Sequence, residues 1–140
     1  METPWKNEPD RLEWTDSKTG LSCLIVRGPL GALCGYVAVP PGHSLHGISY
    51  NSDDLPYSIE AHGGLTYSGA CEAAICHTPA AGEPDNVWWF GFDCAHSGDY
   101  IPGYERHFDA LPFLRDGIYR DLAYVQEECR RLALQLKTGV

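Results

Sequence analysis

The segment from Val87 to Asp99, VWWFGFDCAHSGD, constrains the fold more than any other part of the 140-residue chain. Its first six residues are almost all apolar, which predicts a strand that is covered on both faces. The run then breaks into Asp93, Cys94, His96 and Asp99, whose side chains bind metals or transfer protons. We therefore expect the chain to fold around a buried strand that delivers reactive groups at its end.

Several shorter apolar segments predict the rest of a sheet. Residues 17–20, SKTG, offer a turn, and Gly28 and Pro29 break the chain again before the next apolar run. The connections are too short to hold a helix, so neighbouring strands should be antiparallel. The further strands are expected around Leu12 and Trp14, from Leu21 to Arg27, from Ala32 to Val39 and, as a short strand, from Tyr57 to Ala61.

Apolar residues near the C-terminus recur with helical spacing. They are Ile118, Leu122, Val125, Cys129, Leu132 and Leu136. This stripe predicts an amphipathic helix over residues 116–137, with Asp116 as its N-cap. The stripe suits a second copy of the chain too, but burial against the sheet is the preferred interpretation. The predicted fold class is α+β, an antiparallel or mixed sheet with one long C-terminal amphipathic helix packed on it.

Length and composition predict one domain over residues 1–140, with residues 1–11 as a loosely held arm. The net charge of -9 argues against a nucleic-acid backbone or an anionic membrane as partner. No apolar run approaches the roughly 20 residues that a spanning helix needs.

All ten Lys and Arg residues lie outside 28–105. An anionic ligand in that segment would need backbone amides, His, a metal ion or a terminal Arg folded back over it.

The chain has six cysteines, but its first residues do not resemble a secretory leader. We therefore expect a soluble cytoplasmic protein in which most thiols are reduced core residues. A zinc site is possible on paper, although the spacing is unlike that of a zinc knuckle. Its sulfur and imidazole ligands would come from Cys71, Cys76, His77, Cys94 and His96. A nucleophilic Cys94 beside His96 is a further alternative.

The concentration of His and Asp near glycine-rich turns favours acid–base or metal chemistry. The predicted catalytic residues are His62, Asp93 and His96. The same three residues and Asp99 are the predicted ligands of a divalent ion, Zn, Mn or Mg. Such an ion would neutralise substrate charge where Lys and Arg are lacking.

The segment HGGLTYSG, residues 62–69, forms the expected opposite wall of the site. Its backbone amides could bind a phosphate, although it is neither a P-loop nor a dinucleotide fingerprint. A glycine-dense hairpin with a structural histidine is the competing interpretation. The predicted binding residues are Gly63, Gly64, Thr66, Tyr67, Ser68 and Trp88, the last as a ring that stacks on the ligand.

Four segments carry a resemblance to a known group of proteins. They are CGYVAVPPGH (34–43), HGGLTYSG (62–69), WWFGFDCAHSGD (88–99) and YRDLAYVQEECRRLALQL (119–136). With these segments the chain, from about Leu21 onward, resembles a group of short bacteriophage and prophage proteins. The resemblance implies a small phage-encoded protein of the host cytoplasm, with an accessory function such as blocking host defence signalling. It brings no catalytic residue with it.

Three functions are expected. The first is a small metal-assisted hydrolase acting on a phosphodiester or nucleotide-like molecule. The second is a non-catalytic protein that sequesters a signalling nucleotide, with Arg106 or Arg115 donated across a homo-oligomer interface. The third is a protein inhibitor whose acidic surface mimics a nucleic acid.

Overall fold

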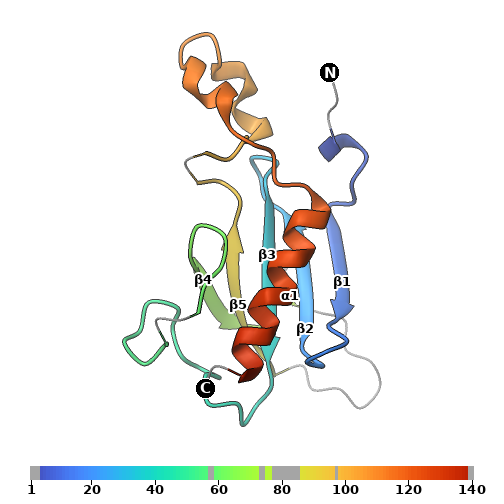
Figure 1. Cartoon of the computed structure of the whole chain (residues 1–140), viewed down its shortest axis with the longest axis vertical. Coiled ribbons are helices and arrows are strands. Elements are labelled where there is room, and N and C mark those ends of the chain that lie inside the picture. Colours follow the sequence, from blue (N-terminus) through green and yellow to red (C-terminus); the bar gives the residue numbers. More distant parts are fainter. Residues whose placement is uncertain (1–3, 57–58, 73–74, 77–85, 97, 139–140) are drawn as a thin grey trace.

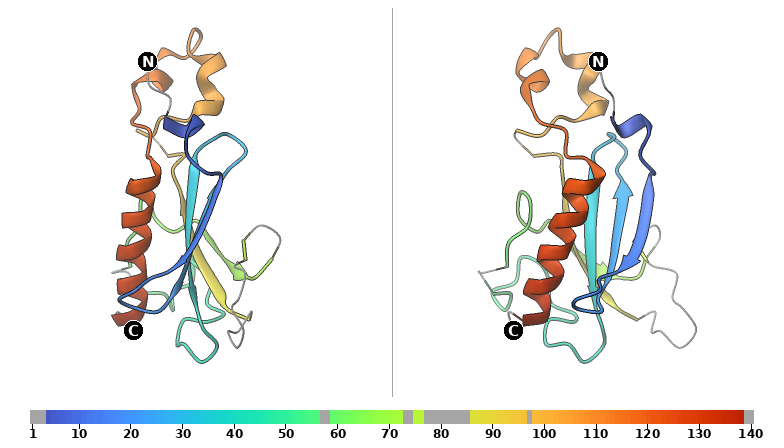
Figure 2. Two further views of the ribbon diagram at one scale, coloured as in Figure 1. Left: turned by 90° about the vertical axis from the view of Figure 1, so that its right-hand side faces the viewer. Right: turned by 45° about the vertical axis from the view of Figure 1, so that its right-hand side comes forward.

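A computed structural model of the chain describes residues 4–56, 59–72, 75–76, 86–96 and 98–138. Its centre is a five-stranded antiparallel sheet of order β1-β2-β3-β5-β4, and one long helix, α1 (Leu122–Thr138), crosses one face (Figures 1 and 2). The α+β prediction is therefore confirmed, and the sheet is antiparallel. The strands are β1 (Arg11–Thr15), β2 (Ser22–Arg27), β3 (Leu33–Val39), β4 (Tyr67–Ala70) and β5 (Trp88–Asp93).

The β1–β2 hairpin turns at the predicted residues. The side chain of Asp16 accepts hydrogen bonds from the amide of Thr19 at 3.0 Å and from its hydroxyl at 2.7 Å. Gly20 has a φ of 76°, which suits a residue without a side chain. Two polar contacts and one glycine thus fix the register in which β1 pairs with β2.

Strand β5 is covered on both faces, as its composition predicted. Phe90 and Phe92 belong to the main core together with the buried residues of α1. Trp89 points to the other face, where it packs with Leu24 and Tyr36 in a second cluster. Trp89 and Phe90 are both 0% exposed, so successive side chains of this strand are buried on opposite sides.

Helix α1 docks through the predicted apolar stripe. Val125, Cys129, Leu132 and Leu136 are all fully buried against the sheet. The helix lies close to β3 because Gly35 has no side chain. A Cβ atom there would lie 2.5 Å from the Phe92 ring and 2.8 Å from the sulfur of Cys129.

The helix begins later than predicted. Asp116 belongs to a short 3-10 helix, η3 (Pro112–Asp116), and is not the N-cap. Asp121 has that role, because its side chain accepts a hydrogen bond from the amide of Tyr124 at 2.9 Å. Ile118 is 61% exposed and lies before the helix. The reason is that Gly117 is extended and Ile118 pairs with Asp99 in a parallel β-bridge.

The described part of the N-terminal segment is held in place, in contrast to the loose arm expected over residues 1–11. It contains a short 3-10 helix, η1 (Pro4–Lys6). Trp5 stacks on Tyr100 with ring centroids 5.3 Å apart. Glu8 accepts hydrogen bonds from the hydroxyl of Tyr119 and from the backbone amide of Leu122, both at 2.6 Å. These contacts join the segment to the start of α1.

Residues 98–118 project from the end of the sheet at which β5 finishes, and they contain η2 (Pro102–His107) and η3 (Figure 1). None of the residues that form these two turns, all of them described, is buried. Leu111 and Phe113 are 44% and 67% exposed. The projection therefore contributes little to the core.

The expected short strand from Tyr57 to Ala61 lies partly outside the described residues, and its remainder, residues 59–61, is irregular. That segment leads into a turn at Gly63 and Gly64, whose φ values are 69° and 87°. Among the helices of the described chain, none combines the length and the apolar character needed to cross a bilayer.

Candidate functional site

Asp99 lies at the centre of a buried polar cluster between the end of β5 and the start of α1. Its side chain is only 1% exposed. It accepts hydrogen bonds from Nε2 of His62 at 2.8 Å, from Nε of Arg120 at 2.9 Å and from the backbone amide of His96 at 3.0 Å. A carboxylate can be buried without a large cost only when it is paired in this way.

Backbone pairing places Arg120 beside Asp99. The amide of Ile118 donates to the carbonyl of Gly98 at 2.8 Å, and the amide of Tyr100 donates to the carbonyl of Ile118 at 2.9 Å. Gly117 permits this approach, because a Cβ atom there would lie 2.5 Å from the backbone of Asp99. Arg120 follows two residues after this bridge and reaches the carboxylate.

His62 connects Asp99 to Tyr124. Its Nε2 faces the carboxylate, and its Nδ1 lies 2.8 Å from the hydroxyl of Tyr124. Because an ionised carboxylate can only accept, the shared proton belongs on Nε2, and in the neutral imidazole Nδ1 then accepts a hydrogen bond from the phenol. The result is a continuous hydrogen-bonded chain from Tyr124 through His62 to Asp99.

Arg120 has hydrogen-bonding capacity left over. Its guanidinium carbon lies 4.9 Å from the centre of the Tyr124 ring, and its Nε is committed to Asp99. Its two Nη groups donate to none of the residues that the structure describes, and its side chain is 23% exposed. A guanidinium presented in this way can bind an anion through two parallel donors.

The surroundings set the charge state of these groups. Burial alone would raise the pKa of Asp99, but hydrogen bonds from His62, Arg120 and the His96 amide outweigh it and hold that pKa below its ordinary value. The Asp99 hydrogen bond raises the pKa of Arg120. Burial, assisted by the carboxylate of Glu128, raises the pKa of Tyr124. Asp99 and Arg120 are therefore ionised, and the phenol keeps its proton.

His96 and Asp93 form a second pair at the edge of the cluster. Their Nε2 and Oδ1 atoms are 3.1 Å apart, but Nε2 is buried and makes no hydrogen bond to the described residues. Gly63 lies directly against the imidazole, since a Cβ atom there would be 2.1 Å from a ring carbon of His96. The rings of His62 and His96 are 6.1 Å apart. The four predicted residues His62, Asp93, His96 and Asp99 are thus neighbours.

They are not arranged as a metal site. His62 and Asp99 bond directly to each other instead of facing a common point. Among the residues that the structure describes, no three His, Cys, Asp or Glu side chains lie where they could hold a metal ion together. A divalent cofactor therefore stays an expectation from the sequence.

Only some of the predicted binding residues lie beside the Asp99 cluster. Thr66 lies beside the cluster, where its hydroxyl donates to Asp93 at 3.2 Å. Tyr67 instead packs edge-on against Tyr36 in the second core cluster, with ring centroids 5.5 Å apart. The hydroxyl of Ser68 accepts from the amide of Tyr50. The amides of Gly64 and Thr66 already donate to backbone carbonyls, so these two amides are not available for the expected anion-binding nest.

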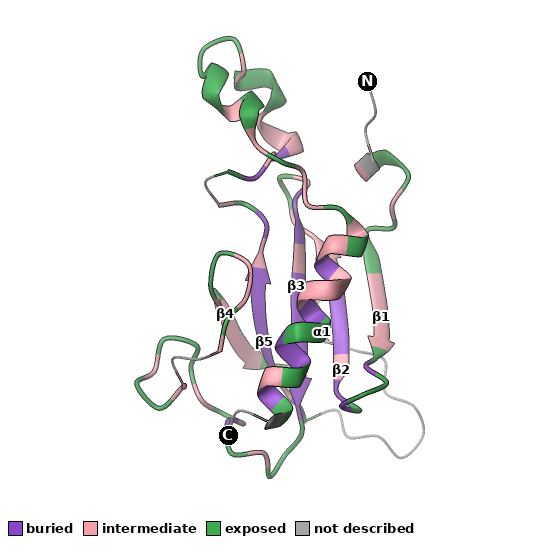
Figure 3. Cartoon of the chain, viewed as in Figure 1, coloured by how far each residue is buried: buried purple, intermediate pink, exposed green. Residues whose placement is uncertain are grey.

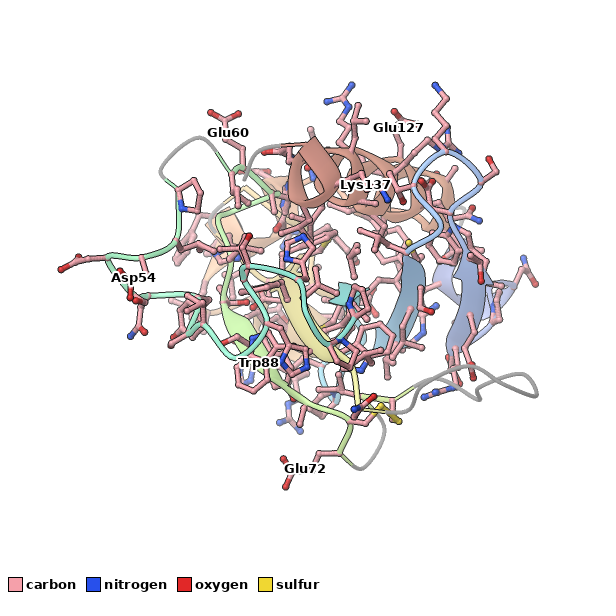
Figure 4. The ribbon with its side chains drawn as sticks, turned by 90° about the horizontal axis from the view of Figure 1, so that it is seen from below. Asp54, Glu60, Glu72, Trp88, Glu127 and Lys137 are labelled. Atoms are coloured by element: carbon pink, nitrogen blue, oxygen red, sulfur yellow. A yellow bond between two sulfur atoms is a disulfide. The ribbon has the colours of Figure 1, made fainter. Side chains whose placement is uncertain are left out.

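Trp88 lies at the far end of β5 from Asp93. Five residues of extended chain separate them by about 16 Å, and the indole donates to the carbonyl of Ile48 at 2.9 Å. Figure 4, viewed from the end opposite η2 and η3, shows Trp88 among the side chains near the viewer. Trp88 and the Asp99 cluster therefore do not face the same small ligand.

Sequence reasoning missed Arg120 and Tyr124. The lack of Lys and Arg over residues 28–105 did raise the option of a terminal arginine folding back, but only Arg106 and Arg115 were named. Arg120 directly precedes Asp121, the N-cap of α1, and Tyr124 lies in the first turn of the helix, so both are close to the start of α1. A search for polar residues at that helix end would have found them.

A pocket of about 500 Å³ adjoins the cluster. His96 and Asp99 belong to both, and the remaining lining comes mainly from the projection of residues 98–118. Figure 3 shows that this projection is largely exposed or partly exposed. Among the other lining residues are Tyr104, Phe113 and Asp116.

The cysteines take no part in this site. Cys71 and Cys76 form a disulfide, which conflicts with both the expected zinc ligands and the expected reduced thiols. His77, the other expected ligand of that segment, lies outside the described residues. Burial and nearby carboxylates raise the pKa of Cys94, and its side chain is 2% exposed, so it is a poor nucleophile. Cys23 and Cys129 are buried core residues, as expected.

Comparison of this chain with protein-family models, with curated proteins and with solved structures finds no significant match.

Proposed function

We propose that the Asp99 cluster binds and hydrolyses a small phosphate ester or phosphodiester. The observation that carries this proposal is the hydrogen-bonded chain from Tyr124 through His62 to Asp99. Beside it lie the Nη groups of Arg120, which donate to none of the described residues. A proton-transfer chain next to a cationic donor is a combination that can catalyse phosphoryl hydrolysis, because one activates water and the other stabilises the developing charge.

The chain would activate water as follows. A water in contact with the Tyr124 oxygen gives its proton to that oxygen, while Tyr124 passes its own proton to Nδ1 of His62. The hydroxide attacks phosphorus, and Asp99 stabilises the imidazolium that forms. When the P–O bond breaks, the proton returns by the same route to the leaving oxygen, so the products are the alcohol and the phosphate.

Arg120 would hold the anionic oxygens. Its Nε is anchored on Asp99, which leaves the Nη pair to meet two phosphoryl oxygens. This role replaces the oligomer-donated Arg106 or Arg115 of the sequence hypothesis. It also replaces the neutralising function that the sequence assigned to a divalent ion, so no step here depends on one.

A sequestering protein is the second candidate, and the shielding of the cluster favours it. The side chain of His62 is only 13% exposed and that of Asp99 only 1%, which leaves little room for an attacking water. The same contacts would then hold a ligand without cleaving it. An acidic mimic of nucleic acid has less support, since the labelled acidic side chains in Figure 4 project on different sides of the molecule.

One experiment separates the two candidates. The protein is incubated with a chromogenic phosphodiester and with small nucleotides, denatured, and the supernatant is analysed. Fragments indicate hydrolysis, whereas intact nucleotide recovered with the protein indicates sequestration. Absence of both retention and cleavage over a broad set of phosphates would eliminate both candidates.

Matched variants test the residues. Tyr124→Phe removes the hydroxyl next to His62 and should lower turnover by about 100-fold or more, with little change in KM. Tyr50→Phe is the control, because Tyr50 lies on a different loop and lines a different pocket. Equal activity of the two variants would contradict the proton-transfer chain.

A further inference from the structure

Several residues that line the pocket beside the Asp99 cluster have no role in the proposed chemistry. His96 and Asp99 form one side of it. Tyr104 from η2 and Phe113 and Leu114 from η3 line it as well. Its volume of about 500 Å³ lies within the range of small-molecule sites.

Phe113 gives this pocket an exposed apolar surface. Its side chain is 67% exposed, the largest exposure among the described large apolar residues. Aromatic rings in proteins are normally covered, and a ring left open beside a pocket offers a flat surface for stacking. The pocket thus suits a planar aromatic group.

Asp116 and Tyr104 supply polar groups that let the same pocket distinguish between ligands. Neither side chain makes a hydrogen bond to the described residues, and both line the pocket. A carboxylate repels phosphate and accepts hydrogen bonds from amino groups and sugar hydroxyls. Arg120 does not line the pocket but bonds to Asp99, which does, and its guanidinium attracts the anionic end of a ligand.

These two observations orient a ligand. We infer that the pocket binds the base and sugar of a nucleotide whose phosphate lies at Arg120, with Phe113 stacked on the base. The inference rests on the proposed function, because it takes the phosphate position from it. It adds the class of substrate: phosphates attached to a planar, hydrogen-bond-donating ring, in preference to ring-free phosphodiesters.

Equilibrium binding of three probes tests the inference. The probes are adenosine monophosphate, ribose 5-phosphate and adenosine, measured by calorimetry on the full chain. Wild-type protein should bind adenosine monophosphate at least about tenfold more tightly than ribose 5-phosphate, the size of effect expected from base stacking. Equal affinity for these two phosphates overturns the ring pocket while leaving the phosphate site intact.

Two variants sharpen the test. Phe113→Ala should weaken the binding of adenosine monophosphate by about tenfold and leave the affinity for ribose 5-phosphate unchanged. Leu111→Ala is the matched control, since Leu111 is exposed on the same projection but does not line the pocket. Equal losses from both variants, or no loss from Phe113→Ala, would count against stacking.

The remaining outcomes separate this inference from the proposed function. Arg120→Ala should weaken the binding of both phosphates and leave the affinity for adenosine unchanged. If adenosine binds and neither phosphate gains affinity from Arg120, the pocket stands and the phosphate site fails. If none of the three probes binds, the inference is overturned as well.

Discussion

The carboxylate of Glu8 accepts a hydrogen bond from the backbone amide of Leu122 at 2.6 Å, across 114 residues of chain. The same carboxylate accepts from Tyr119 and lies 3.4 Å from Nη2 of Arg27. The N-terminal segment therefore satisfies the first amide of α1, which the helix itself cannot do.

Replacement of Glu8 should destabilise the fold. Glu8→Ala leaves Tyr119, Arg27 and the helix amide without their shared acceptor, and the expected loss of unfolding free energy is about 1–3 kcal/mol. Urea unfolding followed by circular dichroism measures it. Glu60→Ala is the control, since Glu60 projects into solvent (Figure 4). A loss no larger than that of the control would show that the contact adds no stability.

The pKa of Asp99 predicts a pH dependence of stability. Because the folded-state pKa lies below the unfolded value of about 3.9, ionised Asp99 stabilises the fold above that value. This stabilisation is lost as the pH falls through the lower, folded-state pKa. Asp99→Asn should therefore be less stable than wild type at neutral pH, by about 3 kcal/mol, and the gap should narrow below about pH 4.

Unfolding free energies measured from neutral to acidic pH test that expectation. Asp53→Asn serves as the reference, because Asp53 is an exposed loop carboxylate. A gap between wild type and Asp99→Asn that stays constant down to acidic pH would exclude the ionised pairing.

Gly63 and Gly64 allow a close comparison of backbone strain and contact. Both have positive φ, but only Gly63 lies against another side chain, that of His96. Gly64→Ala should cost about 1–2 kcal/mol from the left-handed backbone alone. Gly63→Ala should cost more and should shift the NMR signals of the His96 ring. If the two variants have equal stability and unchanged His96 signals, the packing of Gly63 on His96 is wrong.

The disulfide predicts the thiol count. Alkylation after unfolding without reductant should modify four cysteines, and prior reduction should raise the number to six. The link closes a short loop, so Cys71→Ser with Cys76→Ser should lower stability by only about 2 kcal/mol. Mass spectrometry and urea unfolding measure these values. Six modified cysteines without reductant would mean that the bond does not form.

The sheet and the docking stripe were predictable because they depend on local patterns. Alternation and turn residues located the hairpin at Ser17–Gly20, and the continuous apolar run located β5. The start of α1 was not predictable in the same way. Ile118 continues the helical spacing, but its backbone pairs with Asp99, a contact that spacing cannot reveal.

The candidate site was predicted in part for a related reason. His62, Asp93, His96 and Asp99 were grouped by residue type, and they do lie together. Tyr67 was placed on the wrong side, because its direction depends on the register of β4 with β5. Arg120 and Tyr124 could not be found from residue type. Their place in the site depends on which element lies beside the start of α1, and only the tertiary fold determines that.

The docking of α1 has a consequence for synthesis. All five strands precede residue 94, yet Val37, Phe90 and Phe92 stay uncovered on one face until Leu122–Thr138 has been made. A growing chain would thus carry a complete but uncovered apolar sheet while its last third is still being translated, and such surfaces associate readily. Ribosome-bound chains halted before Leu122 should therefore recruit chaperones, and chains that include α1 should release them.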